Sequence, residues 1–326
     1  MKTIRKVIVT EFGSPEQMKV MPVELPDPAS GEVQLRQTAI GFNFIDIYQR
    51  RGVYPLPLPT GLGHEATGIV EAVGPGVNEF KPGDRVAYMH AGIGAYADYR
   101  NVAADRLVRI PEEVTDEQAA ALLFKGITAQ YLVKKTHAVK AGEIVLVHAA
   151  AGGVGQILCQ WAKGLGAFVI GTAGTPEKCA VAKAAGADVA INYSTEDWPA
   201  VLLEATGGKK ANVVYDSVGK NTFLKSLDCA AQFGLVVLFG AASGPAPAID
   251  PELLNKKGCL FLTRPSVFPH NADPKVFRAN AADLFEVIAS GTVKSSIGAK
   301  FKLDDIVEVH KTAELRATSG ATLSIP

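Results

Sequence analysis

The segment 143–166, EIVLVHAAAGGVGQILCQWAKGLG, is the feature that most restricts the fold of this chain. An apolar strand pattern leads directly into a turn of small residues, and a helical pattern begins near Val154. Ala150, Gly152 and Gly155 have the spacing of a dinucleotide-binding turn, with alanine in the first position. Small residues are needed because the chain turns sharply, its backbone approaches a pyrophosphate, and the helix packs closely on the strand. The segment therefore predicts a dinucleotide site at a helix N-terminus, with an ordinary strand–turn–helix as the alternative.

The pattern of secondary structure changes near residue 115. Before it, short apolar runs are separated by Gly, Pro and Asp, which is typical of antiparallel strands with tight turns, and one helical stretch precedes Gly52. Thr115 or Asp116 is predicted to cap a helix, after which apolar strands and helices alternate. Such alternation predicts βαβ units and a parallel sheet. We therefore expect an α/β protein in which a Rossmann doubly wound parallel sheet domain follows a barrel-like β domain.

These patterns also suggest domain boundaries. Residues 1–124 form the predicted β-rich substrate domain, and residues 125–290 form the predicted dinucleotide-binding domain. After Gly291 a short strand, a helix and a last strand follow, so residues 291–326 are expected to return to the substrate domain.

Composition excludes several classes of protein. The 326 residues carry 33 basic and 33 acidic side chains, so nothing indicates an electrostatic surface for nucleic acid or an anionic membrane. The first apolar stretch is too short for a signal peptide, and no stretch has the roughly 20 apolar residues of a membrane span. The four cysteines lie far apart and are expected to be reduced, which favours a cytoplasmic protein. His148 and Cys159, which flank the glycine-rich turn, are interpreted as packing residues.

The residues after the second strand of the parallel sheet favour NADP over NAD. An NAD site normally carries an acidic residue at the end of this strand, and here Thr172 occupies that place. Thr175 is a predicted N-cap, and Lys178 falls in the first turn of the helix, where a cation is unfavourable unless an anion binds beside it. A 2′-phosphate would be that anion. Glu177 argues against this interpretation, and a solvated surface lysine is the alternative.

Several long segments together resemble one family. They are GFNFIDIYQRRGVYP, GLGHEATGIVEAVGPGV, GDRVAY, GAYADY, HAAAGGVGQILCQWAKGLGA, INYSTEDW, VYDSVGK and TRPS. They are similar to the NADPH:quinone reductases, the zeta-crystallin branch of the medium-chain dehydrogenase superfamily, and above all to the bacterial members. The resemblance covers essentially the whole chain and implies a GroES-like β-rich catalytic domain beside an NADPH-binding Rossmann domain.

The resemblance also bears on zinc. Zinc-dependent members of the superfamily take ligands from three segments, whose matching positions in this sequence are Asn43, His64 and Lys125. Asparagine is a poor zinc ligand and a protonated lysine repels the cation. No cysteine precedes Cys159, so the four-cysteine lobe of many relatives is missing too. We therefore expect no metal, with His64 and Glu65 left as a relic or as hydrogen-bonding residues.

The local arguments and the resemblance together suggest two groups of site residues. The predicted cofactor contacts are Gly152, Gly153, Val154, Gly155, Thr172, Lys178, Tyr193, Ser217, Phe239, Gly240, Arg264, Ser266 and Arg316. The resemblance alone implies that the nicotinamide and the substrate would lie in a cleft between the domains lined by Asn43, Asp46, Tyr48 and Thr128. Simpler interpretations exist: Tyr48 as a core aromatic, Asp46 as a capping or ion-paired carboxylate, and Tyr193 and Arg316 as surface groups.

The expected chemistry comes from the cofactor, because the sequence contains no obvious catalytic triad or carboxylate pair. NADPH would reduce a quinone to the semiquinone or hydroquinone, with Tyr48 or water supplying the proton. One alternative is reduction of the double bond of an enal or enone, and another is a non-catalytic NADPH-binding protein with a structural or RNA-binding role. Relatives often assemble through the edge of the parallel sheet, so a homodimer is expected, with no nucleic-acid or membrane partner.

Overall fold

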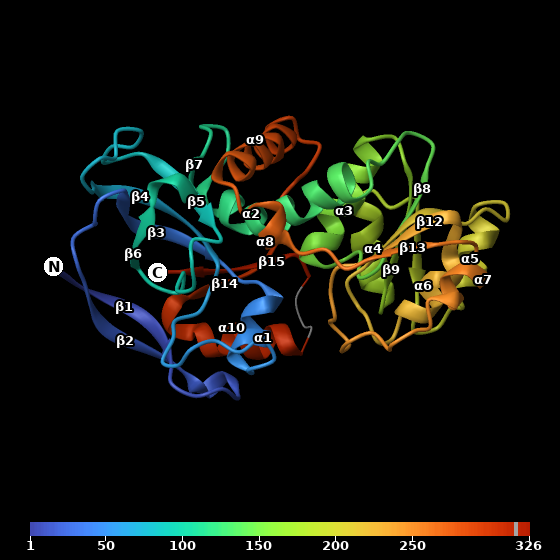
Figure 1. Cartoon of the computed structure of the whole chain (residues 1–326), viewed down its shortest axis with the longest axis horizontal. Helices are drawn as coiled ribbons and strands as arrows, with labels where there is room; N and C mark the ends of the chain where they lie inside the picture. The colour runs from blue at the N-terminus through green and yellow to red at the C-terminus, as the bar shows by residue number, and fades with distance from the viewer. Residues whose placement is uncertain (316–318) are drawn as a thin grey trace. The chain divides into compact units, whose positions relative to one another are not determined.

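The structure is a computed structural model that describes residues 1–315 and 319–326 and divides into two compact units, each built on its own sheet (Figure 1). The first unit comprises residues 1–127, 271–290 and 295–326. The second unit comprises residues 128–270 and 291–294.

The second unit contains a six-stranded sheet in which neighbouring strands are parallel. In spatial order its strands are β10 (Val189–Asn192), β9 (Phe168–Ala173), β8 (Ile144–Val147), β11 (Ala211–Asp216), β12 (Ala230–Leu238) and β13 (Phe261–Thr263). The chain proceeds outward from β8 to β10 on one side and from β11 to β13 on the other, which is the order of a doubly wound sheet. The predicted Rossmann fold is confirmed.

Helices connect these strands and bury them. Helix α3 (Gly153–Gly164) packs with α4 (Pro176–Ala184), and α5 (Trp198–Ala205) packs with α6 (Phe223–Cys229). The core of the second pair consists of side chains from both helices and from the strands beneath them: Trp198, Leu202, Phe223, Leu227, Leu146, Ile170 and Val214. Strands buried on both faces need apolar side chains at nearly every position, which explains the continuous runs in the sequence. This unit also contains two short helices that no sequence pattern predicts, α7 (Glu252–Lys256) and α8 (Val267–His270).

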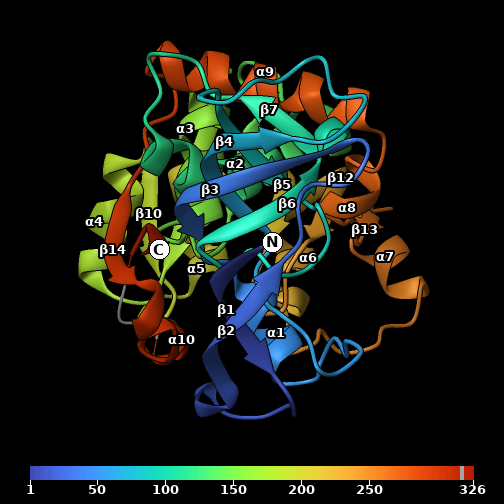
Figure 2. The same cartoon turned by 90° about the vertical axis from the view of Figure 1, so that its left-hand side faces the viewer.

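The first unit contains a mainly antiparallel sheet (Figure 2). In spatial order its strands are β14 (Ile297–Lys302), β15 (Ala321–Ile325), β3 (Glu32–Gly41), β4 (Glu65–Val73), β5 (Arg85–Met89) and β7 (Leu107–Arg109), and β6 (Tyr99–Ala103) also pairs with β3. Strands β14 and β15 are parallel, and β15 pairs with β3 at Leu323↔Gly41. The last strand thus holds the end of β3 at Gly41, two residues before Asn43.

The remaining elements of the first unit surround this sheet. Strands β1 (Lys2–Val9) and β2 (Met18–Leu25) form a separate two-stranded ribbon. The helices are α1 (Phe44–Arg50), α9 (Pro274–Ala289), α10 (Ile306–Glu314) and the start of α2 (Asp116–Tyr131). Shorter helical turns are η1 (Pro15–Gln17), η2 (Ala104–Arg106), η4 (Leu303–Asp305) and, after α2 in the second unit, η3 (Leu132–Thr136). No helix in the described part of the chain is both long and apolar enough to span a bilayer.

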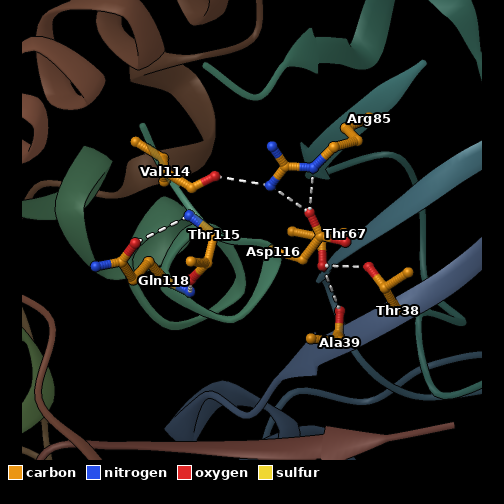
Figure 3. Close-up of polar contacts among 8 residues, drawn as sticks. All are labelled: Thr38, Ala39, Thr67, Arg85, Val114, Thr115, Asp116 and Gln118. Carbon is orange, nitrogen blue, oxygen red and sulfur yellow. Dashed lines mark hydrogen bonds and ion pairs between the residues drawn. The ribbon is translucent and has the colours of Figure 1, made fainter. Parts of the chain in front are cut away.

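The start of α2 is held by a reciprocal cap (Figure 3). The Gln118 N–H donates to Thr115 Oγ1 at 3.2 Å, and the Thr115 N–H donates to Gln118 Oε1 at 2.9 Å. Arg85 of β5 donates to the Asp116 carboxylate at 2.6 Å and to the Val114 carbonyl at 2.7 Å. Thr115 is therefore the cap, and Asp116 ties the helix to the sheet. Capping boxes of this kind satisfy N–H groups that a helix leaves free.

Helix α9 lies in the first unit, whereas the sequence pattern groups it with the dinucleotide-binding domain. Its side chains explain its location. Arg278 donates to both Glu79 oxygens, at 2.8 and 3.0 Å, and to the Ala104 carbonyl at 2.8 Å. Leu284 packs so closely on Gly126 that a Cβ there would lie 2.5 Å from it. These contacts join segments far apart in sequence, so no local pattern reveals them.

Candidate active site

A buried carboxylate organises the end of β3 and the starts of α1 and β4. Glu65 Oε1 accepts hydrogen bonds from Asn43 Nδ2 at 2.8 Å and from the Lys125 ammonium at 3.1 Å. Its second oxygen accepts the Phe124 N–H at 2.7 Å. Gly41 leaves the space for this carboxylate, since a Cβ on Gly41 would lie 2.3 Å from Oε1. Glu65 and Lys125 are both buried, so these bonds offset the cost of removing two charges from water.

A second buried carboxylate lies in the first turn of α1. Asp46 Oδ2 accepts the Asn43 N–H at 2.9 Å and the Tyr96 hydroxyl at 2.8 Å. Burial raises the pKa of Asp46 to about 7, and the nearby Glu65 charge acts in the same direction, while the two hydrogen bonds oppose the rise. Asp46 is therefore a carboxyl group that titrates near neutral pH.

The hydroxyl of Tyr96 connects Asp46 to helix α10. It lies 3.3 Å from His310 Nε2 as well as within reach of Asp46. Burial lowers the pKa of His310 to about 3, and the positive charge of Arg50 contributes to this fall. His310 is therefore neutral, and because Tyr96 donates its proton to Asp46, the ring donates to Tyr96 through Nε2.

His64 lies inside the same unit and is also neutral. Its Nε2 is 3.0 Å from Gln49 Oε1, and its ring lies 5.9 Å from that of Phe124. Burial lowers the pKa of His64 to about 4. Since Gln49 Oε1 can only accept, His64 carries its proton on Nε2 and donates it to Gln49.

Three aromatic rings are adjacent at and after α1. Tyr48 makes edge-to-face contacts with Phe44 at 5.9 Å and with Tyr54 at 5.5 Å, measured between ring centroids. Phe44 and Tyr54 are 39% and 43% exposed, so this aromatic cluster is not simply core packing. Edge-to-face contacts of this kind are the preferred geometry of aromatic pairs.

In the second unit, the glycine-rich turn has the predicted geometry. Helix α3 begins at Gly153, and Gly152, immediately before it, is exposed. Gly155 packs against the turn, because a Cβ on it would lie 2.3 Å from the Ala149 carbonyl oxygen. The backbone N–H groups of Gly153 and Val154 lie in the first turn of α3, where they have no partner within the helix. These features fit the cradle that a pyrophosphate requires.

Thr172 differs from the other predicted cofactor contacts because its side chain is fully buried. Its Oγ1 lies 2.8 Å from Nδ1 of His148, and Nε2 of His148 lies 3.0 Å from Ser226 Oγ. Ser226 in turn donates to Asp216 at 2.8 Å. The Thr172 hydroxyl is thus bonded within the protein, and His148 combines this polar network with an edge-to-face contact to Trp198 at 4.7 Å between ring centroids.

Lys178 and Tyr193 both lie beside the turn between β9 and α4. Thr175 caps α4 by accepting the Lys178 N–H at 3.3 Å, which places Lys178 in the first turn. The Tyr193 hydroxyl lies over Gly174, 2.8 Å from where a Cβ would stand. Ser194 donates to the Gly174 carbonyl at 2.9 Å. The two predicted 2′-phosphate contacts thus flank one short turn.

Other predicted contacts gather at the ends of β11 and β12. The Phe239 N–H donates to the Asp216 carbonyl at 2.9 Å. Arg264 donates to the Leu238 carbonyl at 2.8 Å and is 3.4 Å from that of Gly240. Ser217, the residue after β11, lies 3.5 Å from the His148 carbonyl.

The remaining predicted residues are dispersed. Ser266 is exposed after β13, and Arg316 lies outside the described residues. Asn43, Asp46 and Tyr48 share α1 and its cap in the first unit, while Thr128 is a buried residue of the second. Tyr96 and His310 are absent from the sequence-based set: Tyr96 lies in the segment GAYADY, which contributes only to the family resemblance, and no motif contains His310.

Comparison with known proteins gives matches over the whole chain. Residues 29–112 match the family described as alcohol dehydrogenase GroES-like domain, and residues 153–272 match the one described as zinc-binding dehydrogenase. The quinone oxidoreductase of Pseudomonas aeruginosa is 44% identical over 99% of both chains. The structure of Escherichia coli quinone oxidoreductase complexed with NADPH has a TM-score of 0.96 at 46% identity, covering 99% of this chain and 100% of that one. A 2-haloacrylate reductase of a Burkholderia species is 41% identical over 99% of both chains.

The description of the second family implies zinc, and the residues of this chain do not fit it. The Lys125 ammonium is bound to Glu65, and a protonated amine has no lone pair for a metal. The Asn43 Nδ2 donates to the same carboxylate, and the neutral amide oxygen that remains is a poor zinc ligand. Residues 1–315 and 319–326 contain no group of three His, Cys, Asp or Glu placed to hold a metal ion. No step of the chemistry is therefore assigned to zinc.

The pKa of Asp46 predicts a measurable pH dependence of stability. Its pKa rises from an ordinary 3.8 to about 7 on folding, so the folded protein binds this proton more tightly than the unfolded chain. Its contribution to the free energy of unfolding is complete below pH 3.8 and is lost as pH rises to about 7. We expect urea denaturation to show wild type losing stability relative to Asp46→Asn across this range. The exposed Asp250→Asn variant should follow wild type. Parallel curves for wild type and Asp46→Asn would contradict the assignment.

Proposed function

Because the chain belongs to the quinone oxidoreductase family of the medium-chain dehydrogenases, we propose that it catalyses NADPH-dependent reduction of quinones. The observation that carries this conclusion is the full-length similarity to bacterial quinone oxidoreductases, one of them solved with NADPH. The GroES-like and dehydrogenase matches cover the substrate side and the cofactor side of such an enzyme.

The second unit offers the residues that would hold NADPH. The N–H groups of Gly153 and Val154 at the start of α3 would bind the pyrophosphate, with Gly152 and Gly155 keeping side chains out of the way. Lys178 would bind the 2′-phosphate as a cation in the first turn of α4. Tyr193, on the other side of the same turn, would donate its hydroxyl to that phosphate. When bound, NADPH supplies the hydride.

The residues beside β11 and β12 would hold the rest of the cofactor. Ser217, Phe239 and Gly240 lie beyond the carboxyl ends of these strands, where open α/β sheets bind their ligands. Arg264, which is fixed by the Leu238 carbonyl, supports the loop after β12. These assignments, like those of Thr128, Ser266 and Arg316, are part of the proposal.

The first unit would receive the quinone. The aromatic cluster of Phe44, Tyr48 and Tyr54 gives a flat acceptor half-exposed ring faces to stack against. Tyr48 would donate a proton to the reduced oxygen. The Lys125–Glu65 pair and the Asn43 amide would hold the cap of α1, and Asp46 within it, in one arrangement.

Reduction of an activated carbon–carbon double bond is the second candidate function. It is favoured by one observation, the 41% identity over the whole chain to a 2-haloacrylate reductase. The same fold and cofactor would serve both reactions, but an acrylate carries a carboxylate and needs a cationic partner in the acceptor site. The cation of Lys125 is already paired with Glu65, which favours the uncharged quinone.

Parallel assays separate these two functions. NADPH oxidation is followed at 340 nm with a small para-quinone, with 2-chloroacrylate and with an enal of similar size. We expect turnover with the quinone to be at least tenfold faster in kcat/KM than with either alkene. The reverse order would assign the chain to double-bond reduction. Absence of turnover with all three would indicate a non-catalytic NADPH-binding protein.

The Lys178→Ala variant tests the proposed 2′-phosphate site. A charge-assisted hydrogen bond contributes roughly 1.5–3 kcal/mol, so NADPH should lose about 10- to 100-fold in kcat/KM. NADH, which has no 2′-phosphate, should change little. The matched control is Lys183→Ala in the last turn of the same helix. An unchanged ratio between the two cofactors in Lys178→Ala would refute the assignment.

We also infer that two copies of the chain pair along β13. This strand ends the six-stranded sheet, so one edge of its backbone is unpaired. Phe261 on β13 is 61% exposed, and Phe233 on the neighbouring strand β12 is 63% exposed. A twofold axis beside β13 would join the two sheets and bury these rings. In sedimentation velocity we expect a dimer for wild type and for the exposed control Leu224→Glu, and a monomer for Phe261→Glu. A monomeric wild type would contradict the inference.

A further inference from the structure

Four buried side chains form a continuous hydrogen-bonded chain beneath the proposed cofactor site of the second unit. Thr172 of β9 contacts His148 at 2.8 Å, His148 contacts Ser226 at 3.0 Å, and Ser226 contacts Asp216 at 2.8 Å. All four side chains are buried. His148 directly follows β8, Asp216 ends β11, and Ser226 lies on α6. We call these four residues the His148 chain.

The carboxylate at one end gives this chain a direction. The Ser226 hydroxyl has two acceptors within reach, Asp216 at 2.8 Å and the Thr222 carbonyl at 3.1 Å, and its single proton is donated to them. Ser226 therefore accepts from His148, which places the ring proton on Nε2. Burial lowers the pKa of His148, so the ring is neutral and its Nδ1 accepts the proton of Thr172. Every group then has one role, and the imidazole has one orientation.

The residue after His148 has an unusual backbone conformation. Ala149 has φ +51°, in the left-handed region that side chains other than glycine rarely adopt. This conformation turns the Ala149 carbonyl toward Gly155, where no Cβ is tolerated, and so sets how α3 begins. Backbone strain of this kind persists only where neighbouring structure imposes it.

The neighbouring structure that imposes it comes from two strand ends. The His148 N–H donates to the Tyr215 carbonyl at 3.0 Å, and the Ala150 N–H donates to the Thr172 carbonyl at 2.9 Å. Backbone bonds thus hold both residues that flank Ala149. The His148 side chain adds ties to the same two strands, through Thr172 on β9 and through Asp216 on β11.

We propose that His148 is a positioning residue for NADPH, which holds Ala149 in the left-handed conformation and thereby shapes the turn that binds the pyrophosphate. The inference rests on the proposed function, in that the ligand of the turn is taken to be NADPH. His148 is buried behind the turn and acts through Ala149 rather than by touching the cofactor.

The test compares His148→Leu, Ser226→Ala, Ala149→Gly and the double variant His148→Leu/Ala149→Gly. NADPH dissociation constants are measured by calorimetry without any quinone, so a failed quinone assay would not affect the result. Loss of the His148 hydrogen bonds allows Ala149 to leave the left-handed conformation. Because NADPH binding must then restore that conformation, the dissociation constant for NADPH should rise roughly tenfold in His148→Leu. Glycine adopts the same conformation freely, so the double variant should bind within about twofold of Ala149→Gly.

The controls separate positioning from general destabilisation. Leu227→Ala shortens a buried side chain next to Ser226 and leaves all four residues of the His148 chain in place. It should therefore lower the stability of the protein and leave its NADPH affinity unchanged. If His148→Leu does not fold, Ser226→Ala takes its place, because it removes only one hydrogen bond. NADPH affinity is then compared between Ser226→Ala and the double variant Ser226→Ala/Ala149→Gly. Nitrogen NMR of wild type should show a protonated Nε2 and a bare Nδ1 on His148.

Three results would overturn the proposal. One is unchanged NADPH affinity in folded His148→Leu or Ser226→Ala. Another is a loss of affinity that Ala149→Gly fails to restore. The third is a proton on Nδ1 of the neutral His148 ring, which would reverse the chain and remove its acceptor for Thr172.

Discussion

The buried carboxylate of Glu65 is the group on which the first unit depends. It brings together the end of β3 at Gly41, the cap of α1 at Asn43 and the middle of α2 at Phe124 and Lys125. A carboxylate taken out of water needs such partners, and removing one member of a buried ion pair costs about 3–5 kcal/mol. The cation that balances it belongs to the chain itself, which explains how α1 and its aromatic neighbours are held without a metal.

The second unit uses a buried carboxylate in a similar way. Asp216 Oδ1 accepts the N–H groups of Val218 and Gly219 at 2.8 and 3.0 Å, and both its oxygens lie within 2.8 Å of the Thr222 hydroxyl. It thereby fixes the loop after β11, and through Ser226 it fixes the orientation of His148. In each unit, one buried carboxylate, Glu65 or Asp216, accepts several hydrogen bonds and so fixes the loops and helix starts around it. The residues proposed to bind ligands lie on or next to these loops and helix starts.

The fold of the second unit and the position of its glycine-rich turn could be predicted from the sequence, because both depend on residues close together along the chain. The alternation of strands and helices after Thr115 gives the Rossmann fold, and the spacing of Gly152 and Gly155 gives the turn before α3. Capping rules and the family resemblance predict Lys178 and Tyr193 as 2′-phosphate contacts, and the structure places both beside one turn.

Other features depend on contacts between residues distant in sequence. Thr172 looks available at the end of a strand, but its hydroxyl is bound by His148, 24 positions earlier. His148 looks like a packing residue because Ser226, its other partner, is 78 positions away. Helix α9 follows the Rossmann pattern along the chain, yet Arg278 pairs with Glu79, 199 positions earlier. Local patterns contain no information about these pairs.

The most direct test of the account is whether the enzyme works without metal. Protein purified without added metal is examined by elemental analysis, and NADPH oxidation by a quinone is then measured before and after exhaustive treatment with a chelator. The Lys125–Glu65 pair predicts far less than one zinc per chain and undiminished turnover. One zinc per chain, together with loss of turnover on chelation, would contradict the account.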